Sequence, residues 1–294
     1  MEFDHIWDYQ ENFLNDIGIC KQTKINYIQA LRILKEYSEY CPDWHTSAGM
    51  LKFRDYLTSN LNLGIRSATT YITVTKRFFK YLTNKQIIAY NPSCQLKSFA
   101  YQKSDRTALT KEEVKILLKT IKDSNLPTMY RDYAMVRLLA KTGMRVISLQ
   151  HAKIEDLSTL DKQDIISIRT KGDQSKDNFV MLNNGLKQDI LKCIGKRDSG
   201  YIFVGMGNKN HDEKLTTRHI NRIITGYMNI AGIKTDTNCV HALRHFFVTE
   251  ALNRGCALEN IMDSVHHKSY SGIVVYTSDQ ERIKDRLVCN YIDV

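Results

Sequence analysis

Three short segments contain residue types that can act together on a phosphate ester. In the first, Thr142-Gly-Met-Arg145, an arginine follows a glycine at the expected end of a helix. In the second, His241 precedes Arg244 by three residues. In the third, Tyr276 follows His267 by nine residues. The segments therefore supply guanidinium groups, imidazoles and a phenol.

These groups suit the cleavage of a phosphodiester by a tyrosine nucleophile. Attack on phosphorus builds negative charge on the non-bridging oxygens, and the planar forks of Arg145 and Arg244 match those oxygens better than ammonium groups would. A tyrosine hydroxyl has an unperturbed pKa of about 10, so Tyr276 needs nearby cations or a base to react as phenolate. His241 and His267 can serve in this way or hydrogen-bond the phosphate. This chemistry requires neither a metal nor a nucleotide cofactor.

The charge distribution favours a polyanionic partner. The chain carries a formal net charge of +10 and has a pI of about 9.1. Residues 56–104 contain seven Lys or Arg and no Asp or Glu, whereas ordinary solvated surfaces mix both signs. We therefore expect a helix over 66–83 to lie along DNA, with phosphates contacted by Arg66, Lys76, Arg77 and Lys80.

In these segments the sequence resembles the tyrosine recombinase family, also called the phage integrase family. In length it is similar to the compact Xer-like members of that family. The family's marks are an Arg after a helix-ending Gly, a Lys on a hairpin, His-x-x-Arg, and a His nine residues before the nucleophilic Tyr. Here they fall on Arg145, Lys171, His241, Arg244, His267 and Tyr276. Tyr276 has the family spacing, and Tyr270 and Tyr291 do not.

The resemblance implies a site-specific DNA recombinase that is mainly α with a small β-sheet. An N-terminal helical DNA-binding bundle and an α+β catalytic domain would clasp double-stranded DNA at an inverted-repeat core site. Tyr276 would form a 3′-phosphotyrosyl intermediate, and Lys171 would protonate the leaving 5′ oxygen. A homotetramer would exchange strands through a Holliday junction, with the tail helix, residues 277–294, docked on a neighbouring subunit. The resemblance leaves the biological task open: integration, excision or resolution of a mobile element or replicon. It also leaves open the need for an accessory DNA-bending protein.

Several positions depart from the family pattern. The family usually has Gly where His266 stands, a carboxylate at Ser148, and Thr at Gly272 and Ile273. The hairpin is longer than usual, so Lys171 is preferred to Lys176 because it follows the first strand directly.

Three alternative functions are weighed against this one. A type IB topoisomerase-like enzyme would use nearly the same residues, but that class usually has lysine at the position of His241. A non-catalytic DNA-binding regulator is disfavoured because all six polar positions are retained. His241 and His245 have the spacing of a zinc-binding pair, but Ala242 replaces the Glu of His-Glu-x-x-His.

Helical periodicity predicts how the N-terminal residues are organised. Apolar residues recur at intervals of three and four over 23–41, 50–61 and 66–83. The pair Asn91-Pro92 then ends the helical region. We expect a DNA-binding domain over 1–95, a linker over 96–107 and a catalytic domain over 108–294.

The catalytic domain contains clear local signals. Thr110 and Glu113 form an expected capping box, and a helix over 130–142 should end at a left-handed Gly143. The β-type runs 165–168 and 179–182 flank a polar hairpin tip.

Composition excludes other classes. No apolar run is long enough to span a membrane, and the N-terminus lacks a secretory signal, so a cytoplasmic protein is expected. The seven cysteines include no Cys-x-x-Cys and are expected to be reduced thiols packed as small apolar residues.

Overall fold

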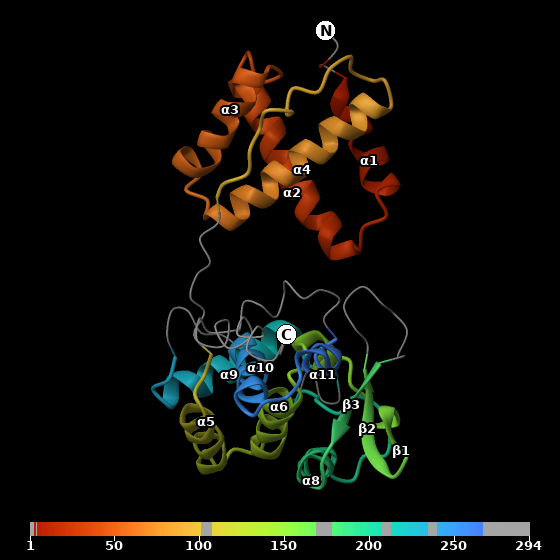
Figure 1. The fold of residues 1–294 in the computed structure, drawn as a ribbon, viewed down its shortest axis with the longest axis vertical. Coiled ribbons are helices and arrows are strands. Elements are labelled where there is room, and N and C mark those ends of the chain that lie inside the picture. Colours follow the sequence, from red (N-terminus) through yellow and green to blue (C-terminus); the bar gives the residue numbers. More distant parts are fainter. Residues whose placement is uncertain are drawn as a thin grey trace, which may run out of the picture. The chain divides into compact units, whose positions relative to one another are not determined.

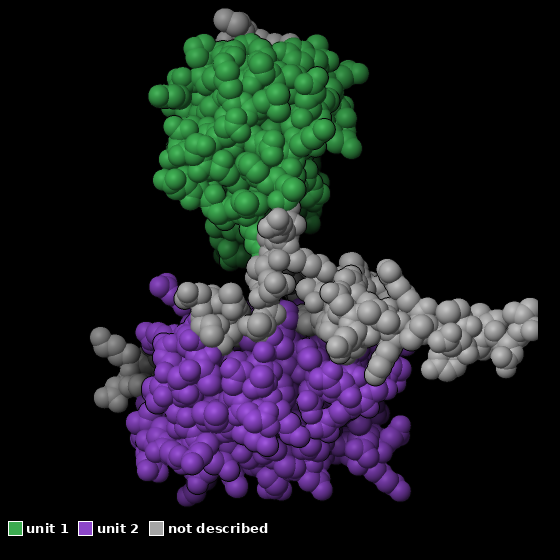
Figure 2. Space-filling view, turned by 60° about the vertical axis from the view of Figure 1, so that its left-hand side comes forward, with its two compact units in different colours: residues 1–104 green, residues 105–294 purple. Residues whose placement is uncertain are grey.

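Two separate hydrophobic cores divide the chain into two units, residues 1–104 and 105–294 (Figures 1 and 2). The structure is a computed structural model that describes residues 3, 5–100, 108–168, 178–206, 213–234 and 240–266. The fold is mainly α with a small sheet, as the sequence predicts.

The first unit is helical throughout its described residues. Its elements are η1 (Ile6–Tyr9), α1 (Gln10–Asp16), α2 (Lys21–Tyr40), α3 (Ser47–Asp55), the π-helical turn η2 (Tyr56–Asn60) and α4 (Ile65–Asn84). α4 packs against α2, and the predicted inward residues Ala68, Ile72, Phe79 and Leu82 are all buried. The second predicted helix, over 50–61, begins earlier than expected as α3 because Thr46 caps it, accepting a hydrogen bond from the Gly49 amide at 3.0 Å.

Contacts of α1 and of residues 96–99 extend the packing of the first unit. Asp16, the last residue of α1, pairs with Lys85 at 3.4 Å and accepts a hydrogen bond from the Tyr81 hydroxyl. Within the predicted linker, Leu96 is buried in the core, and the Arg54 guanidinium lies 4.5 Å from the centre of the Phe99 ring. Packing of the first unit therefore continues to at least Phe99.

The second unit surrounds its core with helices and one sheet. Its elements are α5 (Lys111–Asp123), α6 (Met129–Thr142), α7 (Val146–Gln150), η3 (Ile154–Asp156), β1 (Leu157–Leu160), β2 (Gln163–Ile168), β3 (Asn178–Leu182), α8 (Asn184–Ile194), α9 (Thr217–Ile230), α10 (His241–Asn253) and α11 (Leu258–Ser264). The predicted capping box is confirmed at the start of α5, where both of its hydrogen bonds form.

The sheet is antiparallel in the order β1-β2-β3. The two predicted runs are confirmed as β2 and β3, with Ile166 opposite Val180. The sequence pattern does not indicate β1, because none of its residues is buried and no apolar alternation marks it. The predicted hairpin tip, including Lys171 and Lys176, lies outside the described residues.

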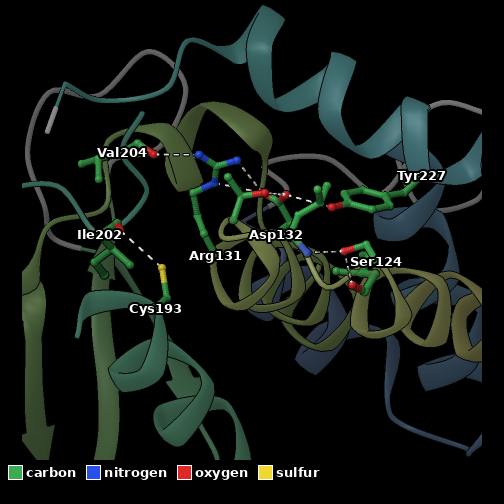
Figure 3. A network of polar contacts seen from close by, with 10 residues as sticks. Ser124, Arg131, Asp132, Cys193, Ile202, Val204 and Tyr227 are labelled. Atoms are coloured by element: carbon green, nitrogen blue, oxygen red, sulfur yellow. Dashed lines mark hydrogen bonds and ion pairs between the residues drawn. The ribbon is translucent and has the colours of Figure 1, made fainter. Parts of the chain in front are cut away.

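A buried polar network joins α6 to α9 and to the segment 201–204 (Figure 3). The Arg131 guanidinium contacts Asp132 at 2.7 Å and donates to the Val204 carbonyl at 3.0 Å. The Tyr227 hydroxyl of α9 donates to the other Asp132 oxygen at 3.1 Å. Removing one partner would leave a buried charge uncompensated, so the network fixes α6 in place. The C-terminal end of α6 leads to Arg145.

The expected packing of the cysteines as small apolar residues is wrong for three of them. Among those that the structure describes, Cys193 is buried, and burial raises its pKa to about 12. Cys20, Cys94 and Cys256 are exposed, so packing as small apolar residues was the wrong prediction for them. In the described ranges, no helix combines the length and apolar character of a membrane span.

Candidate active site and DNA interface

The turn after α6 is shaped by a glycine that has no room for a side chain. Gly143 has φ of 60°, which confirms the predicted left-handed helix end. A Cβ at this position would lie 2.5 Å from Cδ1 of Phe247 on α10. Glycine therefore allows the end of α6 to approach α10 closely, and Arg145 follows directly as the N-cap of α7.

The side chains of Arg145 and Arg244 converge on one short loop. Arg244 on α10 is 2% exposed, and its two terminal nitrogens donate to the carbonyls of Gly143 at 2.5 Å and Val265 at 2.7 Å. The Nη1 atom of Arg145 donates to the next carbonyl, that of His266, at 3.5 Å. These acceptors are neutral, so the contacts orient both guanidinium groups without cancelling their charge.

His241 is the first residue of α10 and lies one turn before Arg244. Its ring and that of His245 pack edge to face, with centroids 5.0 Å apart. The described part of the chain contains no group of three His, Cys, Asp or Glu that could hold a metal ion. The alternative zinc pair thus gains no further ligand from these residues.

His266 shares the loop that the two arginines hold. His266 lines the same cavity as Phe179 on β3, and its buried Nε2 has no hydrogen-bond partner among the described residues. Burial lowers the pKa of His266, and the charges of Arg145 and Arg244 lower it further, against the opposing effect of Asp263. The sequence signal for this residue was only its departure from the expected glycine.

Beside His266, the surface contains a cavity of about 310 Å³ whose lining includes Lys141, Phe179 on β3 and Phe247 on α10. The structure therefore brings Arg145, Arg244 and His241 into one region of the second unit. Lys171, His267 and Tyr276 lie outside the described residues.

A polar stripe without acidic residues runs along the exposed face of α4. Its members recur at intervals of four and three: Arg66, Thr70, Thr73, Arg77 and Lys80. Lys76 is partly buried beside the stripe, and a hollow of about 460 Å³ separates Lys76, Arg77 and Lys80 from residues 91–98. Arg77 also donates to the Tyr27 hydroxyl at 2.6 Å, which holds this guanidinium in place.

A basic helical unit, joined to a second unit with two oriented arginines, is the arrangement expected of an enzyme that acts on DNA strands. The sequence matches the model of the phage integrase family over residues 107–282. The chain belongs to this family, the tyrosine recombinases, and is a site-specific DNA recombinase.

Known recombinases are similar to this chain over nearly its whole length. The tyrosine recombinase XerD of Vibrio vulnificus is 28% identical over 290 residues, which cover 94% of this chain and 92% of the relative. The XerH recombinase bound to its palindromic difH substrate has a TM-score of 0.73 at 20% identity, covering 90% of this chain and 79% of XerH. A lambda integrase tetramer bound to a Holliday junction has a TM-score of 0.71 at 17% identity, covering 93% of this chain and 76% of the integrase. These structures share the fold.

Proposed function

We propose that Tyr276 cleaves one DNA strand while Arg145 and Arg244 hold the attacked phosphate. The supporting observation is that both guanidinium groups contact successive carbonyls, those of Val265 and His266. His267 is the next residue, and Tyr276 follows nine positions later. The clamp is thus anchored to the chain that leads to the proposed nucleophile.

The proposed reaction keeps all bonds in balance. The phenol oxygen of Tyr276 attacks phosphorus, and its proton passes to a neutral histidine, His241 or His267. A 3′-phosphotyrosyl bond forms as the bond from phosphorus to the 5′ oxygen breaks. Lys171 gives its ammonium proton to that oxygen. Attack by another 5′ hydroxyl reverses these steps and needs no ATP, because the phosphotyrosyl linkage retains the bond energy.

A trapped covalent complex tests this reaction. DNA that the protein selects from a random duplex pool is prepared with a nick beside the cleavage point, so that the released fragment diffuses away. The full-length protein is expected to form an adduct that survives denaturation. Binding without an adduct would instead support a non-catalytic regulator. Relaxation of a supercoiled plasmid with a single site would support the topoisomerase-like alternative.

We also propose that residues 1–95 form the core-DNA-binding domain, with α4 contacting phosphates. The exposed stripe carries Arg66, Arg77 and Lys80, and Lys76 lies beside it. Phosphate contacts release counterions, so affinity should fall steeply with salt.

Replacing Lys76 and Lys80 together by Ala is expected to weaken binding at all DNA sequences. The slope of log affinity against log salt should become shallower by about 2, because each lost phosphate contact contributes about one counterion. Fluorescence anisotropy between low and moderate salt measures this slope. Lys35→Ala with Lys52→Ala, which removes lysines outside residues 56–104, is the matched control. An unchanged slope in the Lys76 and Lys80 variant would exclude this face of α4 as the phosphate contact.

We further propose that the protein acts as a homotetramer on two inverted-repeat sites and exchanges strands through a Holliday junction. The second unit has an apolar groove of about 470 Å³ between α5, α6, α10 and α11. Its lining includes Val114, Leu118 and Ile261, and basic side chains such as Lys111 and Lys115 lie at the same groove. This lining complements the tail, residues 277–294.

The tail has the apolar stripe that the groove needs. Its apolar residues fall at helical spacing: Ile283, Leu287, Val288 and Tyr291. Charged residues of both signs lie among them and before them: Asp279, Glu281, Arg282, Lys284, Asp285 and Arg286. Docking of each tail in the groove of the next subunit would close a ring. Because Tyr276 lies just upstream, such docking would couple cleavage to assembly.

Truncation after Asp279 is expected to leave binding to one half-site intact and to abolish synapsis and recombination. The groove of each subunit would then lack its occupant from the neighbour. Mobility-shift assays and light scattering of the DNA complex measure the two steps separately. Recombination at the normal rate by the truncated protein would show that docking between subunits is dispensable, as expected if the tail packs on its own domain.

A further inference from the structure

Two threonines stand between basic residues on the polar stripe of α4. Thr70 and Thr73 are both exposed. Arg66 lies one turn before Thr70, and Arg77 lies one turn after Thr73. At about 1.5 Å per residue, the two arginines are about 16 Å apart along the helix axis. A DNA major groove is about 12 Å wide and admits an α-helix, so the ends of the stripe can reach phosphates on both sides of the groove while the threonines lie over the base edges.

The hydroxyl hydrogens of both threonines are already used within α4. The Thr70 hydroxyl donates to the Arg66 carbonyl at 3.0 Å. The Thr73 hydroxyl donates to the Thr69 carbonyl at 2.8 Å. Because a hydroxyl has a single hydrogen, each oxygen has only lone pairs left for a further bond. Phosphate oxygens also only accept hydrogen bonds, so the two threonines do not suit the phosphates that the flanking cations attract.

Base edges in the major groove offer the groups that these side chains can still contact. In an A·T pair, adenine presents its N6 amino donor and thymine presents its methyl group. A threonine whose hydrogen is used within the helix presents one acceptor oxygen and one methyl group. A G·C pair offers the N4 amino donor of cytosine but no methyl group. An A·T pair therefore matches both features of the side chain.

We propose that Thr70 and Thr73 are specificity-determining residues that read A·T pairs in the major groove of the target DNA. The inference rests on the proposed contact of α4 with DNA. Thr73 lines the hollow of about 460 Å³ together with Arg77 and Lys80, so a strand held by these cations would bring its base edges to Thr73. The bond from Arg77 to the Tyr27 hydroxyl holds this guanidinium in place, and a fixed phosphate contact sets the register of the helix on the duplex.

The experiment removes one methyl group at a time, from the DNA and from the protein. DNA is selected by the full-length protein from a random duplex pool, and each thymine of the selected half-site is then replaced by uracil, which lacks only the methyl group. Binding should weaken by about fourfold at the thymine that each threonine contacts, the effect of burying one methyl group. Thr70→Ser and Thr73→Ser keep the hydroxyl but lack the methyl group. Each should bind the thymine DNA about fourfold more weakly and lose its response to uracil at one position, which shows the coupling of the two methyl groups.

Thr120→Ser is the matched control, because Thr120 of α5 makes the same hydrogen bond, at 3.0 Å to the carbonyl four residues before it, outside the proposed DNA-binding domain. This variant should respond to uracil as the unaltered protein does. Uracil without effect at every position would overturn the inference, and so would a response that persists unchanged in Thr70→Ser and Thr73→Ser. An unchanged salt slope in the Lys76 and Lys80 variant would instead refute the proposed contact of α4 with DNA.

Discussion

Replacement of Tyr276 by Phe should abolish the covalent complex while leaving DNA affinity unchanged. The substitution removes the single oxygen that is proposed to attack phosphorus, and the phenyl ring keeps the shape of the side chain. Because Tyr276 is the proposed attacking group, adduct should fall below detection rather than slow by a modest factor. Denaturing gels of the nicked substrate measure the adduct, and anisotropy measures affinity.

Tyr270→Phe and Tyr291→Phe are the matched controls for this result. Both remove a tyrosine oxygen from the same C-terminal region, but neither has the nine-residue spacing from His267. Both variants should form adduct. An adduct in Tyr276→Phe, together with its loss in Tyr270→Phe, would reassign the nucleophile.

Replacement of Arg244 by Lys is expected to lower the cleavage rate by about 10²- to 10³-fold, the cost of removing one preorganised donor to a developing negative charge. The Arg244 fork spans the carbonyls of Gly143 and Val265. A single ammonium on a flexible stem cannot hold both carbonyls and also present two parallel donors to a phosphate. Single-turnover adduct formation measures the loss.

Arg145→Lys separates catalysis from folding in this comparison. Arg145 is less buried than Arg244. We therefore expect a similar loss of cleavage but a smaller loss of stability, because an unsatisfied polar group costs less where water can reach it. Thermal unfolding measures the difference. Cleavage at an unaltered rate in both Lys variants would show that guanidinium geometry is not required.

Local elements were predictable because local chemistry determines them. The buried face of α4 follows from its apolar spacing, and Thr110 and Glu113 cap α5 through their own side chains. Gly143 ends α6 because glycine adopts a positive φ at little cost. By contrast, α1 and β1 carry weak patterns, since much of their surface faces solvent, and their packing comes from partners elsewhere in the chain.

The sequence predicts which residues form the candidate site, but it does not predict the contacts that orient them. The sequence alone determined which residue types are present, their spacing, the basic stretch of 56–104 and the local helices that carry them. Only the tertiary structure decided that Arg244 reaches the Gly143 carbonyl across 101 residues and that Arg145 reaches the His266 carbonyl across 121 residues. Periodicity reports which face of a helix is buried. It does not report which distant backbone carbonyl that face will meet, because that choice depends on the packing of α6, α10 and α11 together.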